Sequence, residues 1–357
     1  MNKGKKLSAT NRTNYLTYLG VILAFAILQP MSAAGKLSPT MQGQLVPICA
    51  YVVMALSLNL TVGVLGELSL GHAGFMSVGA FSGAVAASAL KDAIPNGGLR
   101  LAAAMVIGAV FAGIVGVLIS VPVLRLNGDY LAIVTLAFGQ IIKSIVENLY
   151  VGVDGRGLHF GFLKPLTNLG QGGRMILNGP MGIPNITKLS SFVAGFVLVM
   201  VTLAVIFNLV NSRAGRAIMA IRDNRIAAES VGLNITKYKM MAFVTSAALA
   251  GAAGALFALG QNTIVASKFD FNTSILILVY VVLGGQGKMW GSIIAATFLT
   301  VLPETPAMRG LADYRMLVYA IVLILVMLAT NNPALQSFFA RFKKDGEDKT
   351  VKGGEQA

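Results

Sequence analysis

Charged side chains are scarce in this sequence. Asp, Glu, Lys and Arg make up 12% of the 357 residues, whereas soluble domains usually contain about 25%. Hydrophobic residues make up 55%, and the mean hydropathy is +0.74. This composition excludes an ordinary soluble domain and predicts a polytopic membrane protein. Since one span needs about 20 apolar residues, we expect an all-α transmembrane helical bundle of about ten spans.

Cysteine and histidine are almost absent. Cys49 is the only cysteine, which supports no disulfide framework, and His72 and His159 are far apart. No Ser/His/Asp group, paired carboxylates or G-x-x-x-x-G-K-[ST] nucleotide-binding motif can be recognised. We therefore expect no catalytic residue, no metal and no cofactor, so that any ATP hydrolysis would belong to a partner chain.

The charge is mostly of one sign, with 28 basic and 14 acidic residues and a net charge of +14. The basic residues lie beside apolar runs, which indicates a positive-inside bias and membrane lipid, and not nucleic acid, as the partner. Residues 1–14 are basic and predict a cytoplasmic N-terminus, residues 15–331 a membrane domain and residues 332–357 a polar cytoplasmic tail. Residues 15–34 also resemble a secretory signal peptide. We favour a retained first span, because both termini then lie inside.

A basic segment, residues 212–239, separates two apolar runs. Apolar residues recur in it near helical spacing, at Ile218, Ile221, Ile226 and Val231. Asp223 or Asn224 can cap a short helix, Gly232 can end it, and Thr236 can cap the helix that follows. Such a segment is either a plain topology signal or a docking helix at the inner membrane face, and the residues alone favour neither.

Two glycine-rich segments interrupt apolar runs: the first glycine break (Gly63–Gly79) and the second glycine break (Gly284–Gly291). Backbone without partners cannot face hydrocarbon, so these segments predict broken or re-entrant elements inside protein or beside a cavity. We expect the breaks to lie near each other, with these candidate residues along a translocation path: Gly66, Ser69, Gly71, His72, Gly74, Gly284, Gly285 and Gly287. Close helix packing through small residues is an equally weighted alternative.

The loop over residues 151–190 is long and rich in Gly and Pro. We predict that it lies outside the membrane, where it is either a contact surface for a substrate-binding protein or a disordered connector. Just before it, Lys143 and Glu147 are spaced to pair on one helix.

The sequence RAGRAIMAIRDNRIAAESVG within the basic segment resembles the coupling loop of ATP-binding-cassette importer permeases for branched-chain amino acids, of the LivM type. LSLGHAGF (residues 68–75) and GGQGKMWG (residues 284–291) resemble two further signatures of that family, with Lys288 where Ser is usual. The resemblance implies that these residues couple the chain to an ATPase: Gly215, Arg216, Arg222, Ala227, Ala228, Glu229 and Gly232.

The same resemblance implies a permease subunit in a bacterial cytoplasmic (inner) membrane. Its expected partners are ATP-binding subunits, a second related permease subunit and an extracytoplasmic substrate-binding protein, with leucine, isoleucine or valine as substrate. Family members also carry urea, amides or other amino acids. An ion-coupled secondary transporter is the alternative from another class. It would need carboxylates within the membrane, for which only Glu67, Glu147 and Glu304 are available.

Overall fold

The computed structural model describes residues 9–35, 38–91, 93–124, 126, 128–154, 157–164 and 173–302, and the single residues 317, 320, 321 and 324. The chain divides into two compact units, Met1–Glu304 and Thr305–Ala357. The first eight residues of the predicted basic N-terminus and the predicted polar tail (residues 332–357) lie outside the described residues.

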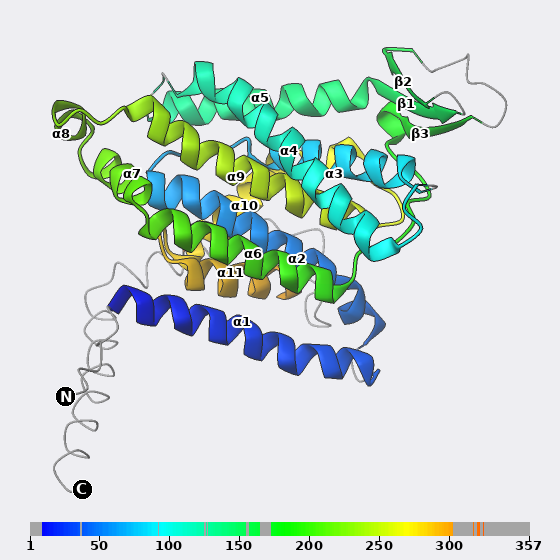
Figure 1. Ribbon diagram of the computed structural model, residues 1–357, viewed down its shortest axis with the longest axis horizontal. Helices are drawn as coiled ribbons and strands as arrows, with labels where there is room; N and C mark the ends of the chain where they lie inside the picture. The colour runs from blue at the N-terminus through cyan, green and yellow to red at the C-terminus, as the bar shows by residue number, and fades with distance from the viewer. Residues whose placement is uncertain are drawn as a thin grey trace, which may run out of the picture. The chain divides into compact units, whose positions relative to one another are not determined.

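The first unit consists mainly of helices (Figure 1). The longer ones are α1 (Ala9–Ala33), α2 (Pro39–Asn59), α3 (His72–Ala89), α4 (Gly97–Val123), α5 (Asp129–Glu147), α6 (Phe192–Asn211) and α9 (Ile235–Ala258). The shorter ones are α7 (Arg213–Asp223), α8 (Arg225–Ser230), α10 (Phe271–Gly284) and α11 (Met289–Val301). A π-helix, η1 (Leu60–Leu65), extends α2, and the 3₁₀ turns are η2 (Gly179–Met181) and η3 (Ala266–Phe269).

Six helices in the described part of the chain are long and apolar enough to cross a membrane. They comprise α1, α2 with its π-helical extension, α4, α5, α6 and α9. Helices α10 and α11 are apolar but shorter. The chain is therefore a mostly helical, multi-pass membrane protein, and the expected number of about ten spans is not confirmed.

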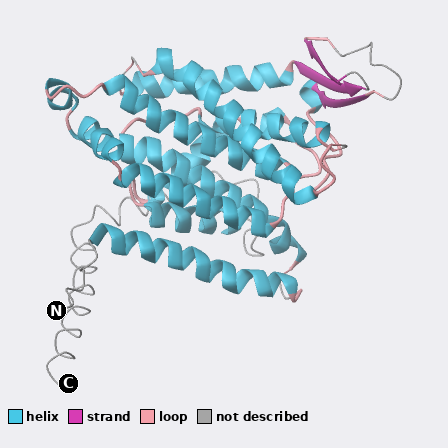
Figure 2. Cartoon of the chain, in the orientation of Figure 1, coloured by secondary structure: helices cyan, strands magenta, loops and turns pink. Residues whose placement is uncertain are grey.

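The loop after α5 folds as an antiparallel sheet, so the expectation of an all-α fold is wrong for this region (Figure 2). Its strands are β1 (Leu149–Asp154), β2 (Gly157–Phe162) and β3 (Arg174–Asn178), in the order β2-β1-β3. Val151 of β1 lies opposite Phe160 of β2 and Leu177 of β3. Strand β2 alternates Gly or His with Leu or Phe, which is the period of two that a strand with one apolar face requires.

Small residues let the central helices approach closely. A Cβ on Gly79 of α3 would overlap the backbone of Gly251 on α9, and a Cβ on Gly108 of α4 would lie 2.9 Å from the Gly79 carbonyl oxygen. Helices in membranes associate through such contacts, because lipid is as apolar as a protein core and supplies no hydrophobic driving force. Helices α3, α4 and α9 thereby form a tight centre for the unit.

Lys143 and Glu147 form the predicted pair near the end of α5, with Nζ and Oε1 3.8 Å apart. Both side chains are partly exposed, so the pair contributes little to stability.

Candidate functional site

The coupling segment (residues 212–239) folds as two short helices, α7 and α8, followed by the start of α9 (Figure 1). Asn224 caps α8, since its Oδ1 accepts from the Ala227 N–H at 3.0 Å. The cap predicted for the next helix is wrong: Asn234 accepts from Lys237 N–H at 3.0 Å, and α9 begins at Ile235. Thr236 already lies inside the first turn and cannot serve as the N-cap.

Gly232 ends the short helix in the predicted way. Its φ of 84° lies in the left-handed region that glycine tolerates best. The next residue, Leu233, donates its N–H to the Ala228 carbonyl at 3.1 Å, and Gly232 donates to Glu229 at 3.0 Å. These are helix-terminating contacts that use carbonyls otherwise left without partners. The segment is therefore an ordered element and not a slack loop.

The four apolar residues that recur near helical spacing divide between two surroundings. Ile218 and Ile221 on α7 are buried, whereas Ile226 and Val231 are 81% and 75% exposed. The first pair anchors α7 to the unit, and each residue of the second pair is exposed on a basic segment.

The other predicted coupling residues also divide into buried and exposed ones. A Cβ on Gly215 would overlap the carbonyls of Leu209 and Val210, so this glycine permits the tight corner between α6 and α7. Arg216 donates from Nη1 to the Asn211 carbonyl at 3.3 Å, again within that corner. Ala228 is buried. The remaining residues of the set on α8 and its C-cap are exposed: Ala227, Glu229 and Gly232.

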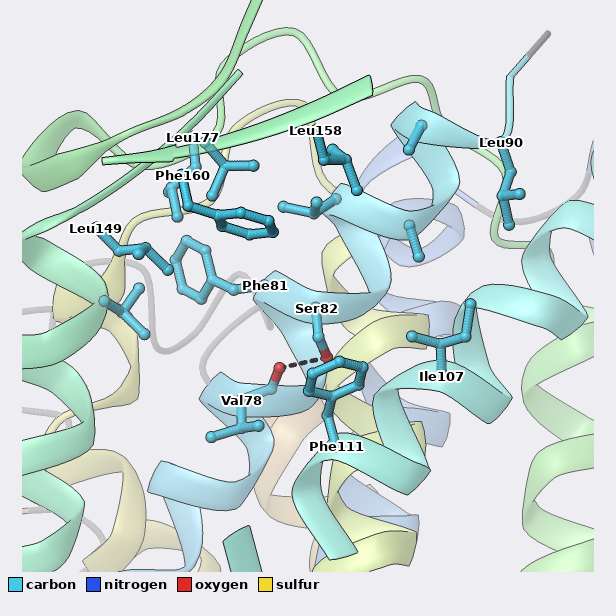
Figure 3. Close-up of a pocket in the computed structure, with 15 residues that line it drawn as sticks. Val78, Phe81, Ser82, Leu90, Ile107, Phe111, Leu149, Leu158, Phe160 and Leu177 are labelled. Atoms are coloured by element: carbon cyan, nitrogen blue, oxygen red, sulfur yellow. Dashed lines mark hydrogen bonds between the residues drawn. The ribbon is translucent and has the colours of Figure 1, made fainter. Parts of the chain in front are cut away.

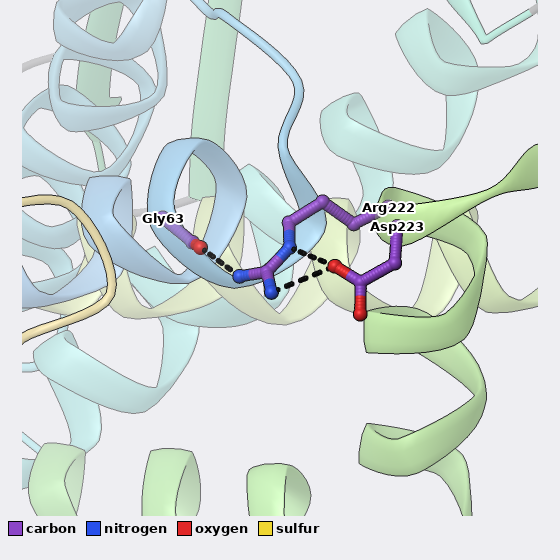
Figure 4. A network of polar contacts seen from close by, with 3 residues as sticks. All are labelled: Gly63, Arg222 and Asp223. Atoms are coloured by element: carbon purple, nitrogen blue, oxygen red, sulfur yellow. Dashed lines mark hydrogen bonds and ion pairs between the residues drawn. The ribbon is translucent and has the colours of Figure 1, made fainter.

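Arg222 turns from the end of α7 toward the first glycine break (Figure 4). Its Nη1 donates to the Gly63 carbonyl at 2.9 Å. Its Nε and Nη2 donate to Asp223 Oδ1 at 3.1 and 2.9 Å. The coupling segment is thus hydrogen-bonded directly to the membrane-embedded part of the chain.

The first glycine break starts within η1 at Gly63, and its irregular part begins where η1 ends. Gly66 has a φ of 81°. From Gly66 to Gly71 the chain has no regular structure, and α3 begins at His72. This stretch passes the start of α9. There, the Glu67 carboxylate pairs with Lys239 Nζ. The two side chains are 13% and 4% exposed. The prediction of a broken element is confirmed for residues 66–71, whereas the remainder of the predicted range is helical, in η1 and α3. A buried ion pair holds the irregular stretch to α9.

The second glycine break is a tight turn between α10 and α11. Gly285 and Gly287 have φ values of 87° and 79°. A Cβ on Gly284 or on Gly291 would overlap the backbone of the other, so the two helix ends touch through glycine alone. Only residues without a side chain permit this corner.

The two breaks meet, as predicted, at Gly63 and Gly287. A Cβ on Gly63 would overlap the Gly287 nitrogen. The Gly287 N–H donates to Asn59 Oδ1 at 2.8 Å, and Asn59 Nδ2 donates to Ser292 Oγ at 2.9 Å. Because Asn59 and Ser292 are fully buried, this network satisfies buried polar groups that would otherwise destabilise the fold.

The later part of the first break packs against α5. A Cβ on Gly71 would overlap the Thr135 carbonyl, and one on Gly74 would lie 3.1 Å from Gly139 Cα. The Leu70 N–H donates to Thr135 Oγ1 at 3.1 Å. These glycines therefore have a clear packing role, and a place along a translocation path stays a prediction.

His72 and Ser69 are also buried, with 2% and 1% exposure. His72 Nε2 lies 2.8 Å from Ser57 Oγ, and Ser246 Oγ donates to the Ser57 carbonyl at 2.5 Å. His72 thereby belongs to a polar contact among α2, α3 and α9.

We expect Gly71→Ala to lower the membrane level of the protein and its transport activity together. The added methyl meets backbone, which cannot rotate away, and overpacking costs about 1–3 kcal/mol. Gly43→Ala is the matched control, because a Cβ there has nothing within 4 Å and Gly43 lies inside α2. Immunoblots of membranes and uptake assays measure both effects. A Gly71→Ala protein present at the normal level but inactive would instead favour the path role.

A cavity of about 480 Å³ lies between α3, α4, α5 and the sheet (Figure 3). Its described lining is apolar except for Ser82, whose hydroxyl donates to the Val78 carbonyl at 2.6 Å. A free amino acid carries an ammonium and a carboxylate, which need polar partners when they leave water. This cavity therefore does not suit a zwitterionic solute.

Three residues with structural roles at this site were not predicted from the sequence. Asn59 and Ser292 connect the two breaks, and Lys239 pairs with Glu67. Asn59 alone had a usable signal, because it is an amide inside an otherwise apolar run. Ser292 and Lys239 resemble ordinary helix residues in the sequence.

Comparison with known proteins gives consistent matches across most of the chain. The family described as "Branched-chain amino acid transport system / permease component" matches residues 41–327. The high-affinity branched-chain amino acid transport system permease protein LivM of Salmonella typhimurium is 36% identical, over 78% of this chain and 66% of that protein. LivM of Escherichia coli is 35% identical, with the same coverage of both chains.

More distant relatives include the ribose import permease protein RbsC of Escherichia coli, 27% identical over 78% of this chain and 81% of that protein. The chain spans slightly less than two-thirds of the length of the two LivM proteins. No solved structure matches it. Since the family match covers most of the chain and includes both glycine breaks and the coupling segment, the chain belongs to the branched-chain amino acid transport system permease family.

Proposed function

We propose that this chain is the permease subunit of an ATP-binding-cassette importer for leucine, isoleucine and valine in a bacterial inner membrane. The observation that supports this most is the coupling segment, an ordered helix–glycine element with two exposed apolar side chains, Ile226 and Val231, and an inward hydrogen bond to the membrane-embedded part. The names of the two LivM relatives supply the substrate class.

In this proposal, Ile226 and Val231 bind a separate ATPase subunit, with Ala227, Glu229 and Gly232 at the border of the contact. Their exposure and position beside basic residues fit a surface that is covered in an assembly. ATP hydrolysis would take place in that partner. A second related permease subunit and an extracytoplasmic substrate-binding protein complete the proposed importer.

Figure 1 supports an orientation for this assembly, because α7 and α8 lie at one end of the bundle and the sheet at the opposite end. If α8 faces the cytoplasm, the sheet lies outside, where Phe160 and Phe162 (67% and 56% exposed) can contact a substrate-binding protein. We propose that both chain termini are cytoplasmic.

This orientation predicts the labelling of two introduced cysteines. In a Cys49→Ala background, Lys5→Cys and Asp345→Cys should resist an impermeant thiol reagent in intact cells and react after lysis. Asn185→Cys, on the sheet side of the bundle, is the control that should react in intact cells. Labelling of Lys5→Cys in intact cells would contradict a cytoplasmic N-terminus.

Ion-coupled transport is less well supported by the structure. Two of the three candidate carboxylates pair with lysines, Glu67 with Lys239 and Glu147 with Lys143. Glu304 lies outside the described residues. At Glu67, a proton or a sodium ion would have to displace the buried ammonium group of Lys239.

Uptake measurements test the proposed function directly. Cells whose only importer is the proposed complex, with this chain as its permease, should accumulate radiolabelled leucine in an ATP-dependent manner. Urea and ribose are the competing solutes. Uptake of urea or ribose but not leucine would change the substrate class, and leucine uptake driven by an ion gradient without ATP would contradict the importer itself.

A further inference from the structure

Arg222 belongs to the coupling segment, and its side chain, 39% exposed, reaches inward to the Gly63 carbonyl. It is the last basic residue of α7, and its guanidinium joins two groups at once, the Gly63 carbonyl and the Asp223 carboxylate (Figure 4). The exposed residues Ile226 and Val231 make no such inward contact in the described part of the chain. In this proposal, Ile226 and Val231 bind the ATPase, whereas Arg222 of the same segment contacts Gly63.

The C-terminal end of η1 favours binding of this guanidinium. The last carbonyls of a helix have no partner within the helix, and the negative end of the helix dipole favours a cation there. Arg222 supplies both the donor and the charge at Gly63. Gly66 leaves room for the arginine stem, because a Cβ at Gly66 would lie 2.5 Å from Arg222 Cγ.

Gly63 also contacts the second break on its other side. The Gly287 backbone lies where a Gly63 side chain would be, and the Asn59 side chain bonds both Gly287 and Ser292. A displacement of Arg222 therefore reaches the turn between α10 and α11 through a single intervening residue. Tightly packed backbone does not deform continuously. A movement of η1 at Gly63 should therefore shift the turn between α10 and α11 as a whole.

We propose that Arg222 is a positioning residue that transmits movement of the coupling segment to the contact between the two glycine breaks. It does so without forming part of the surface that binds the ATPase. Asp223 holds the guanidinium in the orientation that reaches Gly63. This inference rests on the proposed function, and it separates transmission from docking within the segment.

Arg222→Gln in the complete importer tests the proposal. Substrate uptake should fall by about tenfold, within the usual range of coupling between distant sites, while co-purification of the ATPase and its ATP hydrolysis stay near normal. Arg213→Gln is the matched control, because Arg213 is an exposed arginine at the other end of α7. It should leave all three measurements unchanged.

A cross-linking measurement reports the transmission itself. Val64 and Lys288 line one cavity beside the contact between the breaks, and both are replaced with cysteine in a Cys49→Ala background. Cross-linking by a short bifunctional thiol reagent should differ between the nucleotide-free complex and the complex with a non-hydrolysable ATP analogue. In Arg222→Gln, this difference should disappear.

Three results would overturn the proposal: normal uptake by Arg222→Gln, loss of ATPase binding, or a nucleotide-dependent cross-linking difference as large as that of the parent. If Arg222→Gln does not accumulate in membranes, Arg222→Lys replaces it, since lysine keeps the charge but lacks the planar fork that bonds two groups at once. A parent complex without ATP-dependent uptake would contradict the proposed function instead.

Discussion

Lys239→Met is expected to destabilise the protein by about 3–5 kcal/mol, the usual effect of removing one partner from a buried ion pair. The Lys239 side chain is 4% exposed and its partner Glu67 13%. Without the lysine, a carboxylate remains in a protein interior that solvates it poorly. Because Glu67 lies in the first break, this loss should also release the break from α9.

Thermal unfolding of the purified protein in detergent measures this effect. Lys237→Met is the control, since Lys237 is exposed on the same turn of α9, and surface substitutions usually change stability by about 0.5 kcal/mol or less. The double variant Glu67→Gln/Lys239→Met should recover much of the loss, because it leaves no unpaired charge. A double variant as unstable as Lys239→Met would show that the lysine acts through other contacts.

Ile226→Asp is expected to abolish assembly with the ATPase without affecting membrane insertion. Ile226 is 81% exposed, so aspartate there meets water in the isolated chain. In the proposed complex, the same aspartate would be buried against an apolar surface. A central interface residue usually contributes at least about 2 kcal/mol, which predicts a loss of binding of roughly 30-fold or more.

Co-purification with the ATPase, membrane levels and uptake together distinguish the possible results. Ile226→Val keeps an apolar surface and should bind nearly as well as the parent. Gly232→Val should have an intermediate effect, because a β-branched residue is strained at a φ of 84° and should distort the end of α8. Normal ATPase binding by Ile226→Asp would place the docking surface elsewhere.

Local features of this protein could be read from the sequence because they depend only on neighbouring residues. The short helix α8 follows from Asn224 as its cap and Gly232 as its end, and both act within a few residues. The two glycine breaks follow in the same way from glycines inside apolar runs. Even here, Asn234 replaced the predicted Thr236, because asparagine is the better N-cap and lies two residues earlier in the chain.

Strand β2 has a recognisable sequence pattern, although a loop was predicted there. Residues 157–162 alternate apolar side chains with Gly and His, yet the many glycines and prolines around them favoured a loop. Pairing with β1, which in turn pairs with β3, decides the outcome, since a single strand has no partners for its backbone groups.

The contacts that make the candidate site depend on tertiary structure. Lys239 and Glu67 are 172 residues apart, and Asn59 and Gly287 are 228 apart. The chain's apolar composition conceals such partners, because lipid and protein interior are equally apolar and a buried helix face looks like an exposed one. Helices α1 and α2 are both apolar enough to cross a membrane, but 6% of the α1 span is buried and 89% of the α2 span. Composition thus determined that this chain enters a membrane, and only the packing of its helices decided which faces meet protein.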